Sequence, residues 1–229
     1  MKSSFVKQDG ISISLSKDLH ADNEKRSNAN KRTVFNPSQI TQCPRRMFYR
    51  TRGIEHKCDN SFLEEISLKS LADKWIYRFK KCNSIKLIDE HILVAHAQYN
   101  LNGTVDAYVE FINEMYMVKV KPANINEIKD KGAKRKDVVE VVTYLWMAEL
   151  QDALLIYDDM AGRGYEIFHV EPYAPIINTV KNKCSNLIQS QLSGVEPPRL
   201  KGVTVSSEVE ECYNCEHSYT CLNRNLIKT

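Results

Sequence analysis

Three cysteines near the end of the chain have a spacing that suits metal binding. Cys212, Cys215 and Cys221 form a C-x2-C-x5-C pattern, which places three thiolates within ten residues. A short turn can wrap three such ligands around a tetrahedral metal or a small cluster, and a fourth ligand is then required. Zinc is one candidate for this site, and His217 is a residue that can replace one of the thiolates at a zinc ion.

An aspartate and two lysines form a second group of candidate residues. Asp106 lies inside the apolar segment GTVDAYVEFI, where a carboxylate is costly unless something binds it. Lys119 and Lys121 follow in the segment MYMVKVK, and the alternation of strand side chains predicts that both lysines share one face. Acidic oxygens that hold divalent metals, with a cation beside the attacking water or the phosphate, are the groups that phosphodiester hydrolysis needs.

Composition limits where this chemistry takes place. The 229 residues carry a formal net charge of +3, which is too small to indicate nucleic-acid binding by itself, so any basic surface must be local. No apolar run approaches 18 residues, and the polar start MKSSFVKQDG is unlike a signal peptide, so we expect no membrane association. Seven cysteines without an export signal favour metal ligands over disulfides. We therefore expect an intracellular protein, located in the cytoplasm, or in the host cytoplasm if the chain is viral.

The order of predicted elements indicates an α/β fold with a central mixed sheet flanked by helices. Helix-start signals at Asn36-Pro37 open a first helix that should carry Cys43. Residues 130–136 are basic, contain a glycine and are predicted to be a loop. The predicted order is helices over about 37–49 and 62–81, three strands (KLIDEHILVAHAQ, GTVDAYVEFI, MYMVKVK), a helix over 137–152, two strands (ALLIYDD, YEIFHVEP) and a helix over 173–192.

The same pattern divides the chain into one domain with two appended ends. Residues 1–33 are polar without a sustained period, which is typical of an N-terminal arm. Residues 34–205, including the helix with Cys43, form the predicted domain. Residues 206–229 form a C-terminal segment that carries the clustered cysteines.

The setting of Cys43, PSQITQCPRRMFYR, together with the terminal C-x2-C-x5-C, resembles a known group of nucleases. These are the iron–sulfur CRISPR-associated RecB-like exonucleases, with the related AddB and phage RecB-like exonucleases, in the PD-(D/E)XK nuclease superfamily. The resemblance implies a restriction-endonuclease-like fold closed by a 4Fe–4S cluster on Cys43, Cys212, Cys215 and Cys221. It also implies metal-dependent hydrolysis of DNA ends, with Mg²⁺ or Mn²⁺ bound if the chain is catalytically active.

The resemblance also assigns catalytic positions. Gly103-Thr-Val-Asp106 matches the family's metal-binding aspartate, and Lys121 matches its lysine. Glu140 and Tyr144 match a Q-x-x-x-Y element with glutamate in place of glutamine, and Asp73 falls where a family histidine is expected. The implied catalytic residues are Asp106, Lys121, Tyr144 and Glu140, with Asp106 and Asp73 as ligands of a divalent ion.

Lys119 departs from the family pattern, because it occupies the position of a metal-binding acid. A lysine about 4 Å from a divalent ion repels it by roughly 8 kcal/mol at an effective dielectric constant near 20. Glu110, Glu114 or the Glu127-Ile-Lys129 pattern could supply the missing acid from elsewhere. Two hypotheses follow: a metal-dependent deoxyribonuclease, or a nuclease-fold DNA-binding or assembly protein that has lost hydrolysis. A zinc-stabilised interaction module that needs no DNA is a third.

The expected partner under the first two hypotheses is DNA, single-stranded or with free ends. Basic side chains that converge on one surface would contact its phosphates. Tyr49, Tyr144 and Trp75 are candidates for stacking on its bases. The candidate DNA-binding residues are Arg45, Arg46, Lys134, Arg135 and Lys136.

Overall fold

The computed structural model describes residues 34–54, 61–159, 164–200, 212 and 215–223, and for 61–67, 219, 222 and 223 it describes the backbone only. The predicted arm over residues 1–33 lies outside this part of the chain. The helical elements are η1 (Pro37–Gln39), α2 (Pro44–Thr51), α3 (Ser61–Lys81), η2 (Ala97–Tyr99), α4 (Ile125–Lys131), α5 (Arg135–Ala148), α6 (Ala174–Ser193) and α8 (Ser218–Asn223). The strands are β1 (Lys86–His96), β2 (Leu101–Phe111), β3 (Glu114–Pro122), β4 (Ala153–Asp158) and β5 (Tyr165–Val170).

The five strands form one mixed sheet in the order β1-β2-β3-β4-β5. β1, β2 and β3 are an antiparallel meander, and Ile112 and Asn113 make the β2–β3 turn with positive φ angles of 53° and 62°. β3 and β4 are parallel, because the chain between them crosses over through α4 and α5. β5 returns antiparallel to β4. The predicted mixed sheet flanked by helices is therefore confirmed.

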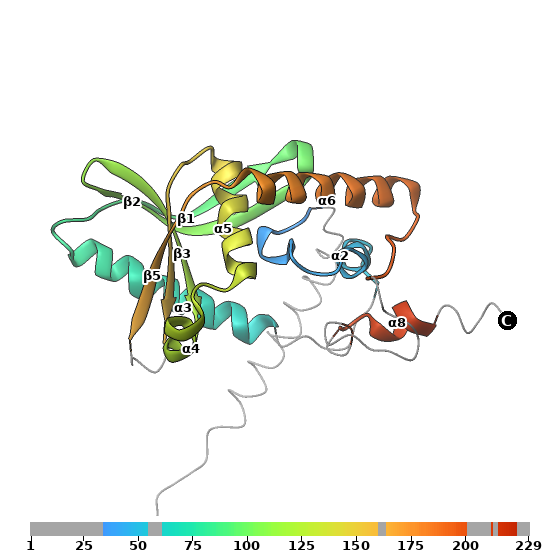
Figure 1. Ribbon diagram of the computed structural model, residues 1–229, viewed down its shortest axis with the longest axis horizontal. Helices are drawn as coiled ribbons and strands as arrows, with labels where there is room; N and C mark the ends of the chain where they lie inside the picture. The colour runs from blue at the N-terminus through green and yellow to red at the C-terminus, as the bar shows by residue number, and fades with distance from the viewer. Residues whose placement is uncertain (1–33, 55–60, 160–163, 201–211, 213–214, 224–229) are drawn as a thin grey trace, which may run out of the picture.

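Helices cover both faces of the sheet, as Figure 1 shows with α3 on one side and α5 on the other. Strand alternation in β3 divides its side chains between two cores: Met117 packs in the core with α2, α5 and α6, whereas Val118 and Val120 pack in the core under α3. Lys119 and Lys121 share the parity of Met117 and so belong to the α5 face. The crossover that makes β3 and β4 parallel thus also brings α5 over the two lysines.

The first helix differs from the prediction, because it is broken at Cys43. Pro37–Gln39 form the short η1 turn, and α2 begins only at Pro44. The residue before a proline is disfavoured in the helical region, and Cys43 accordingly has a non-helical backbone with φ −53° and ψ 130°. Cys43 is therefore the N-cap residue of α2 and does not lie inside a helix.

The predicted loop over 130–136 is also partly helical. The side chain of Asn124 accepts a hydrogen bond from the backbone of Asn126 and caps α4, which continues to Lys131. Gly132 ends the helix with a φ of +77°, and α5 begins at Arg135, two residues before the predicted start. In the described residues, none of the helices is long and apolar enough to span a membrane.

Candidate functional site

The side chain of Asp106 on β2 is held by two donors from β3. The ammonium Nζ of Lys119 lies 2.9 Å from Oδ1, and the backbone N–H of Val120 donates to Oδ2 at 2.7 Å. Nζ of Lys119 also donates to the carbonyl oxygen of Thr104 at 3.0 Å. Asp106 is 9% exposed, so solvent screens this ion pair only weakly. Both carboxylate oxygens of Asp106 are thus already occupied by donors of the protein itself.

Lys121 makes a second ion pair on the same face. Its Nζ donates to Oε2 of Glu140 on α5 at 2.7 Å, and Glu140 is 3% exposed. Two carboxylates and two ammonium groups therefore face one another between β2, β3 and α5. Their formal charges cancel, which is the condition under which a buried charged cluster is stable.

Tyr144 closes this cluster from α5. Its ring centroid lies 5.8 Å from Nζ of Lys119, within reach of a cation–π interaction. Burial raises the pKa of the Tyr144 phenol, and the charges of Glu140 and Asp106 raise it further. The phenol packs so closely on Gly103 that a Cβ atom at residue 103 would lie 2.2 Å from the hydroxyl oxygen. The Gly103 and Tyr144 of the sequence prediction thus meet in the structure.

Asp73 lies apart from this arrangement. It is on α3, its side chain is 53% exposed, and its Oδ1 lies 2.8 Å from Nε2 of His91 on β1. Within the described residues, Asp73, Asp106 and Glu140 do not form a group whose oxygen atoms all lie within 4.8 Å of one another. The divalent-ion ligands that the resemblance implies are therefore not gathered into one site.

The alternative acids also have other contacts. Glu110 pairs with Lys86 at 3.0 Å, and Glu114 accepts a hydrogen bond from the hydroxyl of Tyr116 at 2.6 Å. Glu127 lies on α4 beside Lys131 and Lys134. None of these acids joins Asp106 in a three-ligand group within the described part of the chain. Within the described residues, Asp106 is therefore paired with Lys119, and the acids considered as substitutes have partners of their own.

Glu216 and Cys221 of the C-terminal segment contact α2, which carries Cys43 at its N-cap (Figure 1). Glu216 binds Arg46, with Nη2 2.6 Å from Oε2, and Arg50, with Nε 2.6 Å from Oε1. Burial of Glu216 acts to raise its pKa, but hydrogen bonds from Arg46 and the backbone, with the charges of Arg50 and Arg46, outweigh burial and lower the pKa to about 2. The buried ring of His217 packs edge-on against Tyr49, 5.5 Å between centroids.

The four cysteines of the predicted cluster belong to this docked region. Nη1 of Arg45 lies 3.7 Å from Sγ of Cys221, and the N–H of Cys215 donates to the carbonyl oxygen of Cys212 at 3.2 Å. Burial raises the pKa of Cys215, and a smaller contribution comes from the charge of Cys43. All four cysteines are described, yet no three of their sulfur atoms lie within 4.8 Å of one another. The predicted closure of the fold by a four-cysteine cluster is therefore not shown by the described residues.

The basic residues predicted to bind DNA fall into two places. Arg45 donates to the carbonyl oxygen of Pro197 at 2.9 Å, and Arg46 binds Glu216, so both guanidinium groups contact the C-terminal part of the chain. Lys134 is the N-cap residue of α5, and Arg135 and Lys136 are exposed in its first turn.

The aromatic residues considered for base stacking are buried. Tyr49 is 0%, Tyr144 1% and Trp75 5% exposed, so the stacking prediction is wrong for all three. Each ring packs in one of the two cores of the domain instead.

Two groups of residues were not found from the sequence. Asp158, 1% exposed at the end of β4, accepts hydrogen bonds from Lys74 and from Nε1 of Trp75 on α3, which fixes this helix to the sheet. Asp152, His169 and Glu171 gather at the start of β4 and the end of β5. The sequence signal for this second group is a histidine and a glutamate two residues apart in the segment YEIFHVEP, which was predicted to be a strand.

The architecture resembles that of known exonucleases. An alkaline exonuclease (LHK-Exo) from Laribacter hongkongensis matches with a TM-score of 0.54 and 13% identity over 76% of this chain and 94% of that chain. The same exonuclease in complex with dAMP matches with a TM-score of 0.55, 14% identity and the same coverage. This chain therefore shares the fold of an alkaline exonuclease. No protein-family model and no curated protein matches the sequence. At this identity the likeness concerns the fold, which agrees with the restriction-endonuclease-like prediction.

Proposed function

We propose that this chain is a nuclease-fold DNA-binding protein in which the ammonium group of Lys119 has replaced the catalytic metal and hydrolysis has been lost. The observation that carries this proposal is the ion pair between Lys119 and Asp106, 2.9 Å long, with the other oxygen of Asp106 bound to the amide of Val120. A divalent ion at Asp106 would have to share this carboxylate with the Lys119 ammonium or displace it.

Electrostatics support this proposal. A divalent ion about 4 Å from the Lys119 ammonium would be repelled by roughly 8 kcal/mol at an effective dielectric constant near 20. The ion would also have to displace Lys119 from Asp106 and to compete with Lys121 for Glu140. The two lysines thus neutralise the two carboxylates that metal ions would otherwise neutralise.

The DNA-binding surface in this proposal is the start of α5. Lys134, Arg135 and Lys136 lie at the N-terminus of the helix that also carries Glu140 and Tyr144, so a strand of DNA bound there would pass beside the Asp106 cluster. The preferred DNA in this proposal is single-stranded or has free ends. Arg45 and Arg46 instead position the C-terminal segment through their contacts with Pro197 and Glu216.

The cofactor in this proposal is a 4Fe–4S cluster on Cys43, Cys212, Cys215 and Cys221. Support comes from the C-x2-C-x5-C spacing of three thiolates and from the contact between Arg45 on α2, near Cys43, and Cys221. By analogy with cross-links, closing the long loop from Cys43 to Cys212 would stabilise the fold by roughly 5 kcal/mol. Anaerobically purified protein should be brown and contain four iron atoms per chain, and a colourless protein with one zinc would contradict this assignment.

A second candidate function is an active metal-dependent exonuclease of the RecB-like type. The observation that favours it is the fold shared with an alkaline exonuclease. In this case Asp106 would hold the metal and Lys121 would position water or phosphate, with Glu140 and Tyr144 beside them. Lys119 would first have to leave Asp106.

Labelled single-stranded and double-stranded DNA, incubated with Mg²⁺ or Mn²⁺, separates the two candidates. The proposal predicts no cleavage by the native chain and cleavage by Lys119→Glu, which restores an acid beside Asp106. The matched control is Lys86→Glu, which reverses the charge of an exposed lysine on β1 and should stay inactive. Cleavage by the native chain that disappears in Asp106→Ala would refute the loss of hydrolysis. Failure of the native chain to bind DNA at low salt would refute the DNA-binding role.

A further inference from the structure

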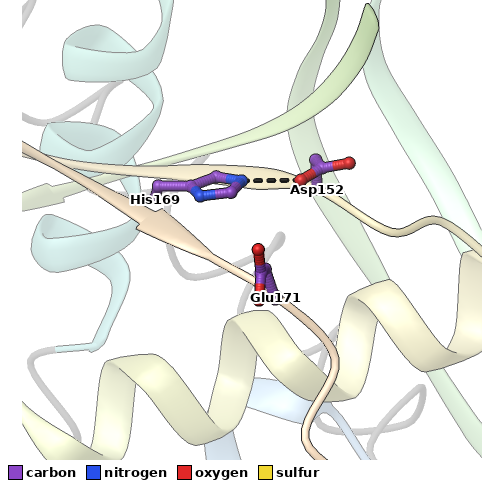
Figure 2. Close-up of side chains that lie close together, drawn as sticks. All are labelled: Asp152, His169 and Glu171. Carbon is purple, nitrogen blue, oxygen red and sulfur yellow. Dashed lines mark hydrogen bonds and ion pairs between the residues drawn. The ribbon is translucent and has the colours of Figure 1, made fainter.

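Three metal-ligating side chains gather where β4 begins and β5 ends, away from the Asp106 cluster. One ligand atom each from Asp152, His169 and Glu171 lies within 4.8 Å of the other two. Nε2 of His169 is 2.6 Å from Oδ1 of Asp152, and in Figure 2 the carboxylate of Glu171 lies next to this pair. This donor set contains one imidazole nitrogen and two carboxylates, so it is not a purely acidic cluster.

The strand register explains why the three side chains meet. Ala153 pairs with Val170 and Leu154 with His169, so Asp152 and Glu171 are the next residues across the same antiparallel pair. Side chains alternate along a strand, and His169 and Glu171 therefore point to the same face as Asp152. The carbonyl oxygen of Asp152 also accepts a hydrogen bond from the N–H of Met117 on β3. The hydrogen-bonded pairing of β4 and β5 thus holds the three ligands in place.

One carboxylate of the group has no partner within the described residues. Asp152 has His169 as its ion-pair partner, and in the described part of the chain Glu171 has no hydrogen bond or ion pair with another residue. Two carboxylates within 4.8 Å of each other repel, and a divalent cation between them would remove this repulsion.

One of the three residues, His169, also lines an apolar hollow of about 320 Å³. The ring of Tyr116 contacts the ring of His169 there, 5.9 Å between centroids. A metal ion with three protein ligands keeps open coordination positions for water or a small ligand. The hollow is lined by Ile85, Val109, Phe111, Tyr116, Leu154 and His169.

We propose that Asp152, His169 and Glu171 bind one divalent transition-metal ion, of the class that includes Mn²⁺, Co²⁺ and Zn²⁺. The imidazole nitrogen favours such ions over Ca²⁺ and Mg²⁺, and the absence of a thiolate in this group disfavours Cu⁺. The site is independent of the function proposed for the Asp106 cluster.

The full chain is titrated with Mn²⁺ to test this site. Electron paramagnetic resonance measures the concentration of free Mn²⁺ at each step, and the bound Mn²⁺ follows by difference. Mn²⁺ prefers oxygen and nitrogen ligands to thiolates, so binding of Mn²⁺ by the four cysteines should not contribute to the measured binding. One Mn²⁺ should bind per native chain, and binding should weaken by more than about tenfold in His169→Ala, because losing even an outer partner of a ligand costs that much. Glu171→Gln is the second variant, since it removes a charge and preserves the shape of the side chain.

The matched control is His91→Ala, which removes a histidine from a similar exposed pair with Asp73 that has no third ligand. This variant should bind Mn²⁺ as the native chain does. No bound Mn²⁺ at millimolar concentration, or binding that is unchanged in both His169→Ala and Glu171→Gln, would overturn the proposed site. Binding that is lost in Asp106→Asn and kept in His169→Ala would also overturn it, and would at the same time contradict the proposed loss of the catalytic metal.

Discussion

Asp106 and Lys119 form the contact on which the proposed function depends. The shared face of Lys119 and Lys121 was predictable, because it follows from strand alternation alone. The acidic partners of the two lysines could not be predicted. The pairing of Lys119 with Asp106 depends on how β2 and β3 align, and that of Lys121 with Glu140 depends on where α5 crosses the sheet. The group of Asp152, His169 and Glu171 was missed for a similar reason, since it arises from the β4–β5 register.

Removing the lysine should leave a buried carboxylate with one protein donor. We expect Lys119→Met to lower the free energy of unfolding by about 3 kcal/mol in urea denaturation, because breaking a buried ion pair leaves a charge uncompensated. Adding Asp106→Asn to this variant should recover part of the loss. The control is Lys86→Met, whose ion pair is exposed and should contribute less than about 1 kcal/mol. Equal effects of the two lysine substitutions would contradict the buried ion pair.

Gly103 should be intolerant of even one methyl group. A Cβ at this residue would lie 2.2 Å from the hydroxyl oxygen of Tyr144, so Gly103→Ala should destabilise the protein by about 2 kcal/mol through overpacking. Thermal unfolding measures this loss. Combining Gly103→Ala with Tyr144→Phe, which deletes that oxygen, should restore part of the stability, and strictly additive losses would argue against the contact.

The elements of the fold follow their local signals where these signals are strong. The strand segments and the helices α5 and α6 were found from periodicity, and their ends shifted by a few residues. The first helix and the loop over 130–136 were predicted incorrectly, although both corrections have local causes: Pro44 excludes Cys43 from the helix, and Asn124 and Gly132 delimit α4. The anchoring of α3 could not be predicted, because Asp158 comes from a strand more than 80 residues later.

The anchor of α3 should therefore be sensitive to the charge of one residue. Asp158→Asn should lower the free energy of unfolding by about 3 kcal/mol, because Lys74 and Arg78 would lose their buried carboxylate. Chemical denaturation of this variant can be compared with that of Glu90→Gln, which removes an exposed partner of Lys80 on the same helix. The second change should cost less than about 1 kcal/mol. A similar small effect of Asp158→Asn would mean that packing alone holds α3.

At the scale of the whole molecule, the sequence correctly predicted a mixed sheet flanked by helices, because the order of elements leaves few ways to bury both faces of the strands. The resemblance to nucleases agrees with the shared fold of an alkaline exonuclease. The proposed cluster and the docking of the C-terminal segment involve residues far apart in sequence, so only the cysteine pattern pointed to them. A net charge of +3 gave no indication of where DNA would bind.

The basic start of α5 should account for the salt dependence of DNA binding. Replacing Lys134, Arg135 and Lys136 by alanine should weaken binding to single-stranded DNA and lower the slope of log K against log salt by about 2. Fluorescence anisotropy at several salt concentrations gives this slope. The charge-matched control replaces Lys69, Lys81 and Lys86, which are exposed residues of α3 and β1, by alanine. Equal changes in the two triple variants would indicate binding without a defined surface.

The central claim is that Lys119 occupies the place of the catalytic metal, and cleavage of labelled single-stranded and double-stranded DNA by the native chain in Mn²⁺ tests it most directly. We predict that no cleavage product forms and that the Asp106→Ala variant is indistinguishable from the native chain in this assay. Product that forms with the native chain and disappears with Asp106→Ala would show that Asp106 binds a catalytic metal despite Lys119, and would contradict the claim.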